Sequence, residues 1–192
     1  MARTLTIPVE LGYKAPDFDL LDTSSKQMMN YANIAGTKGT VVMFICNHCP
    51  FVVHVMDELV RIGNDYKEQG IGFVAISSND VATHPDDSPE NMAKLASKHG
   101  FPFPYLYDET QDVAKAYTAA CTPDFSVFDA NHKCVYRGQL DTSRPGNGEP
   151  TNGTDLRTAL DALVNDSKII EDQKPSIGCN IKWKPGNEPS YY

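Results

Sequence analysis

The sequence lacks any apolar run long enough to cross a membrane or to form the core of a signal peptide. Basic residues are also scarce, since 17 lysines and arginines stand against 25 aspartates and glutamates, giving a net charge of −8. Such an acidic chain offers no basic patch for nucleic acid or for an anionic membrane surface. We therefore expect a cytoplasmic protein that binds neither nucleic acid nor membrane.

Cysteines are few and odd in number. Five cysteines in a chain of 192 residues do not form a disulfide scaffold. The chain has one Cys-x-x-Cys motif, Cys46-Asn47-His48-Cys49, and neither a second such motif nor a His-x-x-x-His to complete a tetrahedral zinc site. A metal site built from Cys46, Cys49 and either His48 or His54 is the alternative interpretation. We expect no structural metal and no bound cofactor.

The Cys-x-x-Cys motif follows an unbroken apolar run, Thr40–Ile45, which predicts a buried parallel strand. Pro50 suits the first turn of a helix over residues 50–69. Unpaired N–H groups and the positive end of the dipole at a helix N-terminus favour thiolate over thiol. The sequence therefore predicts redox chemistry, with Cys46 as the acidic, attacking thiol and Cys49 as the thiol that resolves the mixed disulfide.

The remaining periodicity predicts a single α/β domain over residues 1–192 with a thioredoxin-like fold, a central mixed sheet flanked by helices. An N-terminal β-hairpin precedes the central strand, and a helix-strand-helix insertion follows the second parallel strand. Residues 166–192 carry apolar anchors such as Trp183, which predict a C-terminal extension packed on the domain. The predicted elements are strands near 17–21, 27–29, 71–77, 101–107, 125–129 and 134–138, and helices over 89–99, 108–117 and 154–165.

A second candidate site lies at Cys121-Thr122-Pro123, just before the hairpin over 125–138. A proline has no N–H to give to a ladder, so Pro123 belongs at an edge or a bend. In a thioredoxin-like fold, a cis-proline at this place lies against the Cys-x-x-Cys motif, and the residue before it presents its backbone to a substrate chain. We therefore predict a substrate-docking loop at Thr122 and Pro123, with an ordinary trans-proline turn as the alternative.

Other residues near these motifs have less certain roles, and three of them have two open interpretations each. His48 either stabilises a Cys46 thiolate or is solvated. Cys121 is either a third redox thiol or a small buried residue. Cys179, in the C-terminal extension, either resolves an oxidised Cys46 or packs in the interior. Cys134 is predicted to be a core residue and His84 a solvated loop residue.

Six segments spread over almost the whole chain match a known family: Gly12–Phe18, Cys46–Pro50, Cys121–Phe125, Tyr136–Asp141, Ser143–Asn147 and Pro175–Asn187. On these segments the chain resembles the peroxiredoxin-like branch of the alkyl hydroperoxide reductase/thiol-specific antioxidant (redoxin) group, within the thioredoxin superfamily. The resemblance implies a redox enzyme with antioxidant activity, and it makes a thiol-dependent peroxidase the alternative to a dithiol exchanger.

The chain departs from true peroxiredoxins around the peroxide pocket. Cys49-Pro50 matches the family's cysteine-proline end, but Cys46 stands where the family has threonine and Val42 where it has proline. The neighbourhood of the family's arginine holds Thr122-Pro123. Threonine and arginine orient the peroxide and stabilise the departing oxygen. Their absence favours a thiol-disulfide oxidoreductase, similar to membrane-tethered thioredoxin-like reductases.

The expected substrate is thus a disulfide-bearing protein or a small-molecule disulfide, or a hydroperoxide in the alternative reaction. A thiol reductant would supply the electrons. A non-enzymatic metal carrier or sensor, using Cys46, Cys49 and a histidine, is the third class of function that the motif allows.

Overall fold

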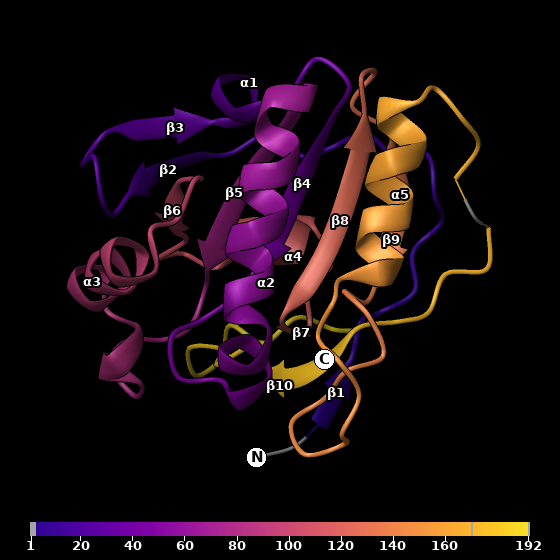
Figure 1. Ribbon diagram of the computed structural model, residues 1–192. Helices are drawn as coiled ribbons and strands as arrows, with labels where there is room; N and C mark the ends of the chain where they lie inside the picture. The colour runs from indigo at the N-terminus through magenta and orange to yellow at the C-terminus, as the bar shows by residue number, and fades with distance from the viewer. Residues whose placement is uncertain (1–2, 170, 192) are drawn as a thin grey trace.

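The computed structural model describes residues 3–169 and 171–191 (Figure 1). Seven strands form the main sheet in the order β3-β2-β6-β5-β4-β8-β9, and three form a small sheet in the order β1-β10-β7. The strands are β1 (Arg3–Leu5), β2 (Asp19–Asp22), β3 (Met28–Asn30), β4 (Gly39–Phe44), β5 (Ile71–Ser77), β6 (Tyr105–Tyr107), β7 (Cys121–Thr122), β8 (Asp124–Asp129), β9 (Cys134–Gly138) and β10 (Ile177–Asn180). The helices are α1 (Tyr31–Ile34), α2 (Pro50–Tyr66), α3 (Pro89–His99), α4 (Asp112–Ala116) and α5 (Thr154–Val164).

The strand β4 is the centre of the main sheet. It pairs in parallel with β5 and antiparallel with β8, so the sheet is mixed. Successive side chains of a strand point to opposite faces. Val41 and Met43 pack into a core with α2 and α5, whereas Val42 and Phe44 pack into a core with α4. Because both faces of β4 are covered, its sequence is continuously apolar, as the predicted buried strand requires.

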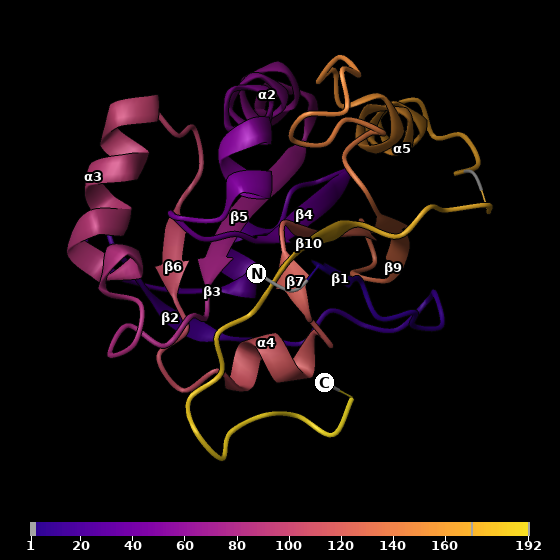
Figure 2. The ribbon, with the colours of Figure 1, turned by 90° about the horizontal axis from the view of Figure 1, so that it is seen from below.

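The helices lie in two layers around this sheet. Figure 2 shows α2 and α5 together on one face and α4 on the opposite face. Cys49 is the N-cap of α2, and Pro50 occupies the first helical position, where a missing N–H costs nothing. One 3-10 turn and Gly70, with φ of 83°, end the helix. This arrangement holds the Cys-x-x-Cys motif at the carboxyl end of β4.

The small sheet was not predicted from the sequence. In it, β10 lies between β1 and β7 and pairs antiparallel with both. Gly178 makes this close packing possible, since a Cβ there would lie 1.9 Å from the carbonyl oxygen of Thr122. Further along the C-terminal segment, Ile181 and Trp183 are buried in the core that contains α4. The segment therefore returns to the carboxyl end of β4, where the cysteine motif lies.

The predicted α/β architecture is confirmed, including the N-terminal hairpin of β2 and β3 and the hairpin of β8 and β9. The predicted helix over residues 108–117 was too long, because α4 begins at Asp112. Gln111 adopts φ of 67°, which no helix interior allows. Asp108 lies outside the helix, and its carboxylate accepts the Ala114 N–H at 2.9 Å. Among the described residues, no helix is both long and apolar enough to span a bilayer.

Candidate active site

The two motif cysteines lie next to each other where β4 leads into α2. Their exposed fractions are 1% for Cys46 and 0% for Cys49, so both thiols are shielded from solvent. Cys49 is the N-cap of α2, and the first N–H groups of the helix face its side, with the Val52 N–H bonding its sulfur. The sequence therefore places one thiol at the positive end of the helix and the other three residues before it.

The predicted docking loop contacts both thiols through one residue. Thr122 Oγ1 lies 3.4 Å from Cys46 Sγ, and the Thr122 carbonyl oxygen lies 3.2 Å from Cys49 Sγ. The Thr122–Pro123 peptide bond is cis. The structure thus brings the loop at Thr122 and Pro123 against the Cys-x-x-Cys motif.

The acidity of the two thiols is the reverse of what we expected from the sequence. The hydrogen bond from Cys46, followed by bonds from Cys179 and the Val52 N–H, lowers the pKa of Cys49 to about 5. The same hydrogen bond, together with burial and the nearby Asp87 carboxylate, raises the pKa of Cys46 well above its usual value. The shared hydrogen bond thus favours the thiolate on Cys49 over Cys46, and the attacking role that we expected for Cys46 stays a prediction.

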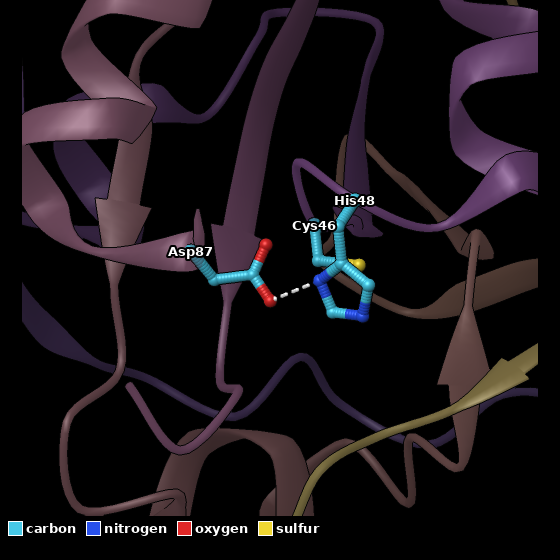
Figure 3. A group of neighbouring side chains, drawn as sticks. All are labelled: Cys46, His48 and Asp87. Carbon is cyan, nitrogen blue, oxygen red and sulfur yellow. Dashed lines mark ion pairs between the residues drawn. The ribbon is translucent and has the colours of Figure 1, made fainter. Parts of the chain in front are cut away.

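Asp87 and His48 lie together beside Cys46 (Figure 3). His48 Nδ1 lies 2.7 Å from Asp87 Oδ2, a close contact without the alignment of a regular hydrogen bond. The Asp87 carboxylate also accepts the Asn47 N–H at 2.7 Å and Asn79 Nδ2 at 2.8 Å. These bonds fix a fully buried carboxylate in place and hold His48 next to the thiol.

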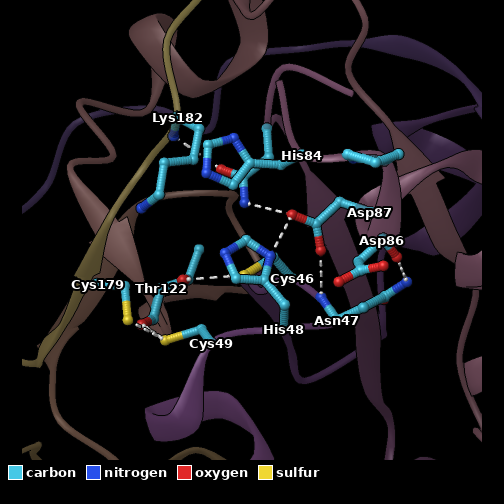
Figure 4. Close-up of polar contacts among 12 residues, drawn as sticks. Cys46, Asn47, His48, Cys49, His84, Asp86, Asp87, Thr122, Cys179 and Lys182 are labelled. Atoms are coloured by element: carbon cyan, nitrogen blue, oxygen red, sulfur yellow. Dashed lines mark hydrogen bonds and ion pairs between the residues drawn. The ribbon is translucent and has the colours of Figure 1, made fainter. Parts of the chain in front are cut away.

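His84 extends this group, although we expected a solvated loop residue. Its ring stacks on His48 with centroids 5.2 Å apart and an interplanar angle of 19° (Figure 4). Burial and the neighbouring His48 lower the pKa of His84. The loop after β5 therefore covers the cysteine motif with a second imidazole.

The residues that lie close enough together for a metal site differ from the predicted metal ligands. Donor atoms of Cys46, His48 and Asp87 all lie within 4.8 Å of one another. The predicted set used Cys49 and allowed His54, but His54 Nε2 lies 3.1 Å from Thr151 Oγ1. A structural zinc site takes four protein ligands, and both oxygens of Asp87 already accept hydrogen bonds. This group fits a thiol with a neighbouring base better than a closed metal site.

Cys179 lies at the motif, on the side of Cys49. The two sulfurs are 2.7 Å apart, and Cys179 has an exposed fraction of 2%. Burial, followed by the hydrogen bond with Cys49, raises the pKa of Cys179 to about 12. The position of Cys179 is compatible with both interpretations from the sequence, packing and redox chemistry. The motif cysteine that Cys179 contacts is Cys49 and not Cys46.

The other two cysteines lie in different surroundings. Cys121 Sγ is 3.9 Å from Thr6 Oγ1, and burial raises the pKa of Cys121 well above its usual value. Cys134 is buried in β9, and burial raises its pKa to about 11. Both thiols are protonated at neutral pH, which suits small buried side chains rather than nucleophiles.

Sequence analysis missed Asp87 and Tyr105. Tyr105 is fully buried, and its hydroxyl lies 3.2 Å from Asn47 Oδ1, inside the motif. Both residues come from elements on the β5 side of β4: Asp87 from the loop after β5, and Tyr105 from β6, the next strand beyond β5. The topological rule that loops after neighbouring parallel strands meet at one edge could have pointed to Asp87.

The chain is similar to known proteins in sequence and in structure. The chain is 28% identical over 130 residues to the thiol-disulfide oxidoreductase ResA of Geobacillus thermodenitrificans, a match that covers 65% of this chain and 67% of that protein. A crystal structure of an uncharacterized conserved protein from Geobacillus kaustophilus is 56% identical, has a TM-score of 0.95 and covers 97% of this chain and 98% of its own.

A more distant structure identifies the fold. The thioredoxin domain of a thiol-disulfide oxidoreductase from Bacteroides vulgatus superposes with a TM-score of 0.59 at 17% identity, covering 78% of this chain and 98% of that domain. This likeness confirms the predicted thioredoxin-like fold. The model of the AhpC/TSA family matches residues 11–137, which include the cysteine motif, the cis-proline and the hairpin of β8 and β9. With two thirds of its length matched in this way, the chain belongs to the AhpC/TSA family.

Proposed function

We propose that the protein is a thiol-disulfide oxidoreductase whose working dithiol is Cys49 and Cys46. The observation that carries the proposal is the contact of Thr122, the residue before a cis-proline, with both thiols of the pair. The similarity to ResA supports the same class of reaction and a disulfide as the substrate. A thiol reductant then returns the protein to its dithiol form.

The first step follows from the acidity of Cys49. Its thiolate attacks one sulfur of the substrate disulfide, forms a mixed disulfide with that half and releases the other half as a thiolate. A pKa of about 5 keeps Cys49 ionised at neutral pH. The protonated Cys46 beside it is not yet nucleophilic.

The second step requires Cys46 to lose its proton. We assign the role of base to His48, because a nitrogen of its ring lies within 4.8 Å of the Cys46 sulfur and Asp87 lies against its Nδ1. After proton transfer to His48, the Cys46 thiolate attacks Cys49 Sγ and displaces the second half of the substrate. The substrate is then reduced to two thiols, and the protein carries a Cys46–Cys49 disulfide.

Peroxidase activity, the second candidate, is favoured by family membership and by the acidic Cys49 before Pro50. A peroxide pocket also needs donors that stabilise the departing oxygen. The buried Arg137 pairs with Asp124 at 3.2 Å and donates to Ser126. Its guanidinium therefore binds these residues and not the cysteine motif. The recorded partners of Cys49 among the described residues are Cys46, Cys179, Thr122 and a helix N–H. These surroundings suit a second sulfur better than a peroxide.

Trapping of the mixed disulfide tests the proposal. The double variant Cys46→Ser/Cys179→Ser removes the two thiols that bond Cys49, and Cys49→Ser/Cys179→Ser is the matched control that keeps Cys46. After treatment with glutathione disulfide, mass spectrometry should find a stable glutathione adduct on Cys49 in the first variant and little adduct on Cys46 in the second. Equal adducts in both variants, or an adduct only on Cys46, would contradict the assignment of Cys49 as the attacking thiol.

A further inference from the structure

The strand β10 occupies the docking edge of the site. It pairs antiparallel with β7, and its Cys179 is the residue directly opposite Thr122. Thr122 is the residue that contacts both motif thiols. A chain that pairs with this edge in this register therefore presents its own residue to the dithiol, and in this protein that residue is a cysteine.

Cys49 and Cys179 lie close enough for their sulfurs to form a disulfide. Cys179 Sγ lies 2.7 Å from Cys49 Sγ, and the sulfurs of a disulfide are about 2.05 Å apart. Gly178 allows the approach, since any side chain there would meet the Thr122 carbonyl oxygen. The exposed fractions of 1%, 0% and 2% for Cys46, Cys49 and Cys179 mean that an external disulfide does not reach these sulfurs in this conformation.

We propose that β10 is a built-in substrate strand: it fills the place of a substrate chain at Thr122 and makes Cys179 the internal disulfide partner of Cys49. The inference rests on the proposed function for its consequences and adds a third working thiol to it. External disulfides enter only when β10 leaves the edge of β7. The preferred substrate is accordingly a protein segment that pairs with this edge as an extended strand.

The chemistry balances without a further reactant. An external disulfide reacts with the Cys49 thiolate, which forms a mixed disulfide and releases one thiolate. When β10 returns, Cys179 Sγ attacks Cys49 Sγ, and the second half of the external disulfide leaves as a thiol that takes the Cys179 proton. The protein then holds a Cys49–Cys179 disulfide, having lost two electrons to the substrate. Attack of Cys46 on Cys49 Sγ passes this disulfide to the Cys46–Cys49 pair and frees Cys179, with no net change in electrons.

Disulfide mapping tests the internal partner. In Cys46→Ser, tryptic peptide 39–61 contains Cys49 as its one cysteine, and peptide 169–182 contains Cys179. After glutathione disulfide treatment, the single variant should yield these two peptides joined by a disulfide and only a transient glutathione adduct. A glutathione adduct in Cys46→Ser as stable as in Cys46→Ser/Cys179→Ser would overturn the inference. Failure of the double variant to form any adduct counts instead against the proposed function, because Cys179 is absent from it.

Displacement of β10 tests the strand itself. A methyl group in Gly178→Ala would meet the Thr122 carbonyl oxygen at 1.9 Å, and in Gly72→Ala it would meet the Ile34 carbonyl oxygen at the same 1.9 Å, away from the site. We expect Gly178→Ala to raise the rate of Cys49 alkylation by iodoacetamide by about tenfold, from the usual cost of an overpacked position. The control Gly72→Ala should leave this rate near that of the unaltered protein. Equal acceleration in both variants, or none in Gly178→Ala, would show that β10 does not gate the dithiol.

Discussion

His48 Nδ1 lies 2.7 Å from Asp87 Oδ2, and both side chains lie beside the Cys46 thiol. This relationship gives the buried, weakly acidic Cys46 a neighbouring base and gives that base a fixed carboxylate. In the Cys179→Ser background, where Cys46 is the thiol that releases the second half of the substrate, His48→Gln should therefore slow this release and leave formation of the mixed disulfide unchanged. We expect a loss of about 10²-fold, at the lower end of the usual range for general base catalysis. Rapid-quench mass spectrometry of the glutathione adduct on Cys49 measures both steps.

The matched control for this variant is His84→Gln, which removes the imidazole that stacks on His48 but does not contact Asp87 in the recorded contacts. Its release rate should fall much less than that of His48→Gln, since the His84 ring stacks on His48 but is not the ring that lies beside the Cys46 sulfur. Equal slowing in both variants would mean that the two rings act by covering the site and not by proton transfer.

Asp87→Asn should destabilise the fold and change the acidity of Cys46. The amide presents an NH₂ group where two donors, the Asn47 N–H and Asn79 Nδ2, now bond the carboxylate. Leaving a buried donor unsatisfied costs about 1–3 kcal/mol. Loss of the negative charge also lowers the pKa of Cys46. Urea unfolding gives the first quantity, and the exposed Asp86→Asn serves as the control, with an expected change within about 0.5 kcal/mol. An unchanged midpoint for Asp87→Asn would contradict this role of the carboxylate.

The thiolate of Cys49 should titrate at low pH. Its ultraviolet absorbance, taken as the difference between the unaltered protein and Cys49→Ser, should be half-maximal near pH 5, where the pKa of the thiol lies. Since the thiolate is the nucleophile, reactivity should be nearly complete at pH 7 and fall about tenfold for each pH unit below 5. A midpoint near pH 8.5, the usual value for a cysteine, would show that the helix N-terminus and its neighbouring thiols do not stabilise the thiolate.

Arg137 should act on stability and not on the dithiol. Its side chain has an exposed fraction of 3%, and its partner Asp124 is fully buried. Arg137→Met leaves that carboxylate unpaired, which typically costs about 3–5 kcal/mol. Adding Asp124→Leu should recover most of this loss. Lys38→Met, which removes a surface pair with Asp166, is the control and should change stability by less than about 1 kcal/mol. A loss of similar size in Lys38→Met would contradict the prediction that burial of the Arg137–Asp124 pair causes the loss of stability in Arg137→Met.

Much of the fold follows from local pattern. The apolar run before Cys46 predicts β4, because a strand buried on both faces is continuously apolar. The periodicity after Pro50 predicts α2, because a helix buried on one face repeats its apolar residues every three or four positions. The cis-proline loop at Pro123 could also be placed, because a proline before a strand is confined to few positions. These features depend on residues close together in the chain.

The parts that could not be predicted depend on distant residues. The strand β10 has four residues, no alternation and a glycine, and it forms only because β1 and β7 lie on either side of it. The acidity of Cys49 relative to Cys46 depends on the hydrogen bond between the two thiols, on Cys179 from β10 and on Asp87, which is brought in by the loop after β5. Charge interactions across such loops leave no local signal at the cysteine motif.

The rate constants of the fully reduced protein toward a protein disulfide and toward hydrogen peroxide test the central claim most directly. The measurement follows loss of the Cys49 thiol by quenched alkylation under pseudo-first-order conditions, with Cys49→Ser as the blank. The account predicts that peroxide reacts with Cys49 no faster than with an ordinary accessible thiolate, whereas the protein disulfide reacts faster and leaves a Cys46–Cys49 disulfide. A peroxide rate constant orders of magnitude above that of an ordinary thiolate, with slow reaction of the disulfide, would identify a peroxidase and contradict the account.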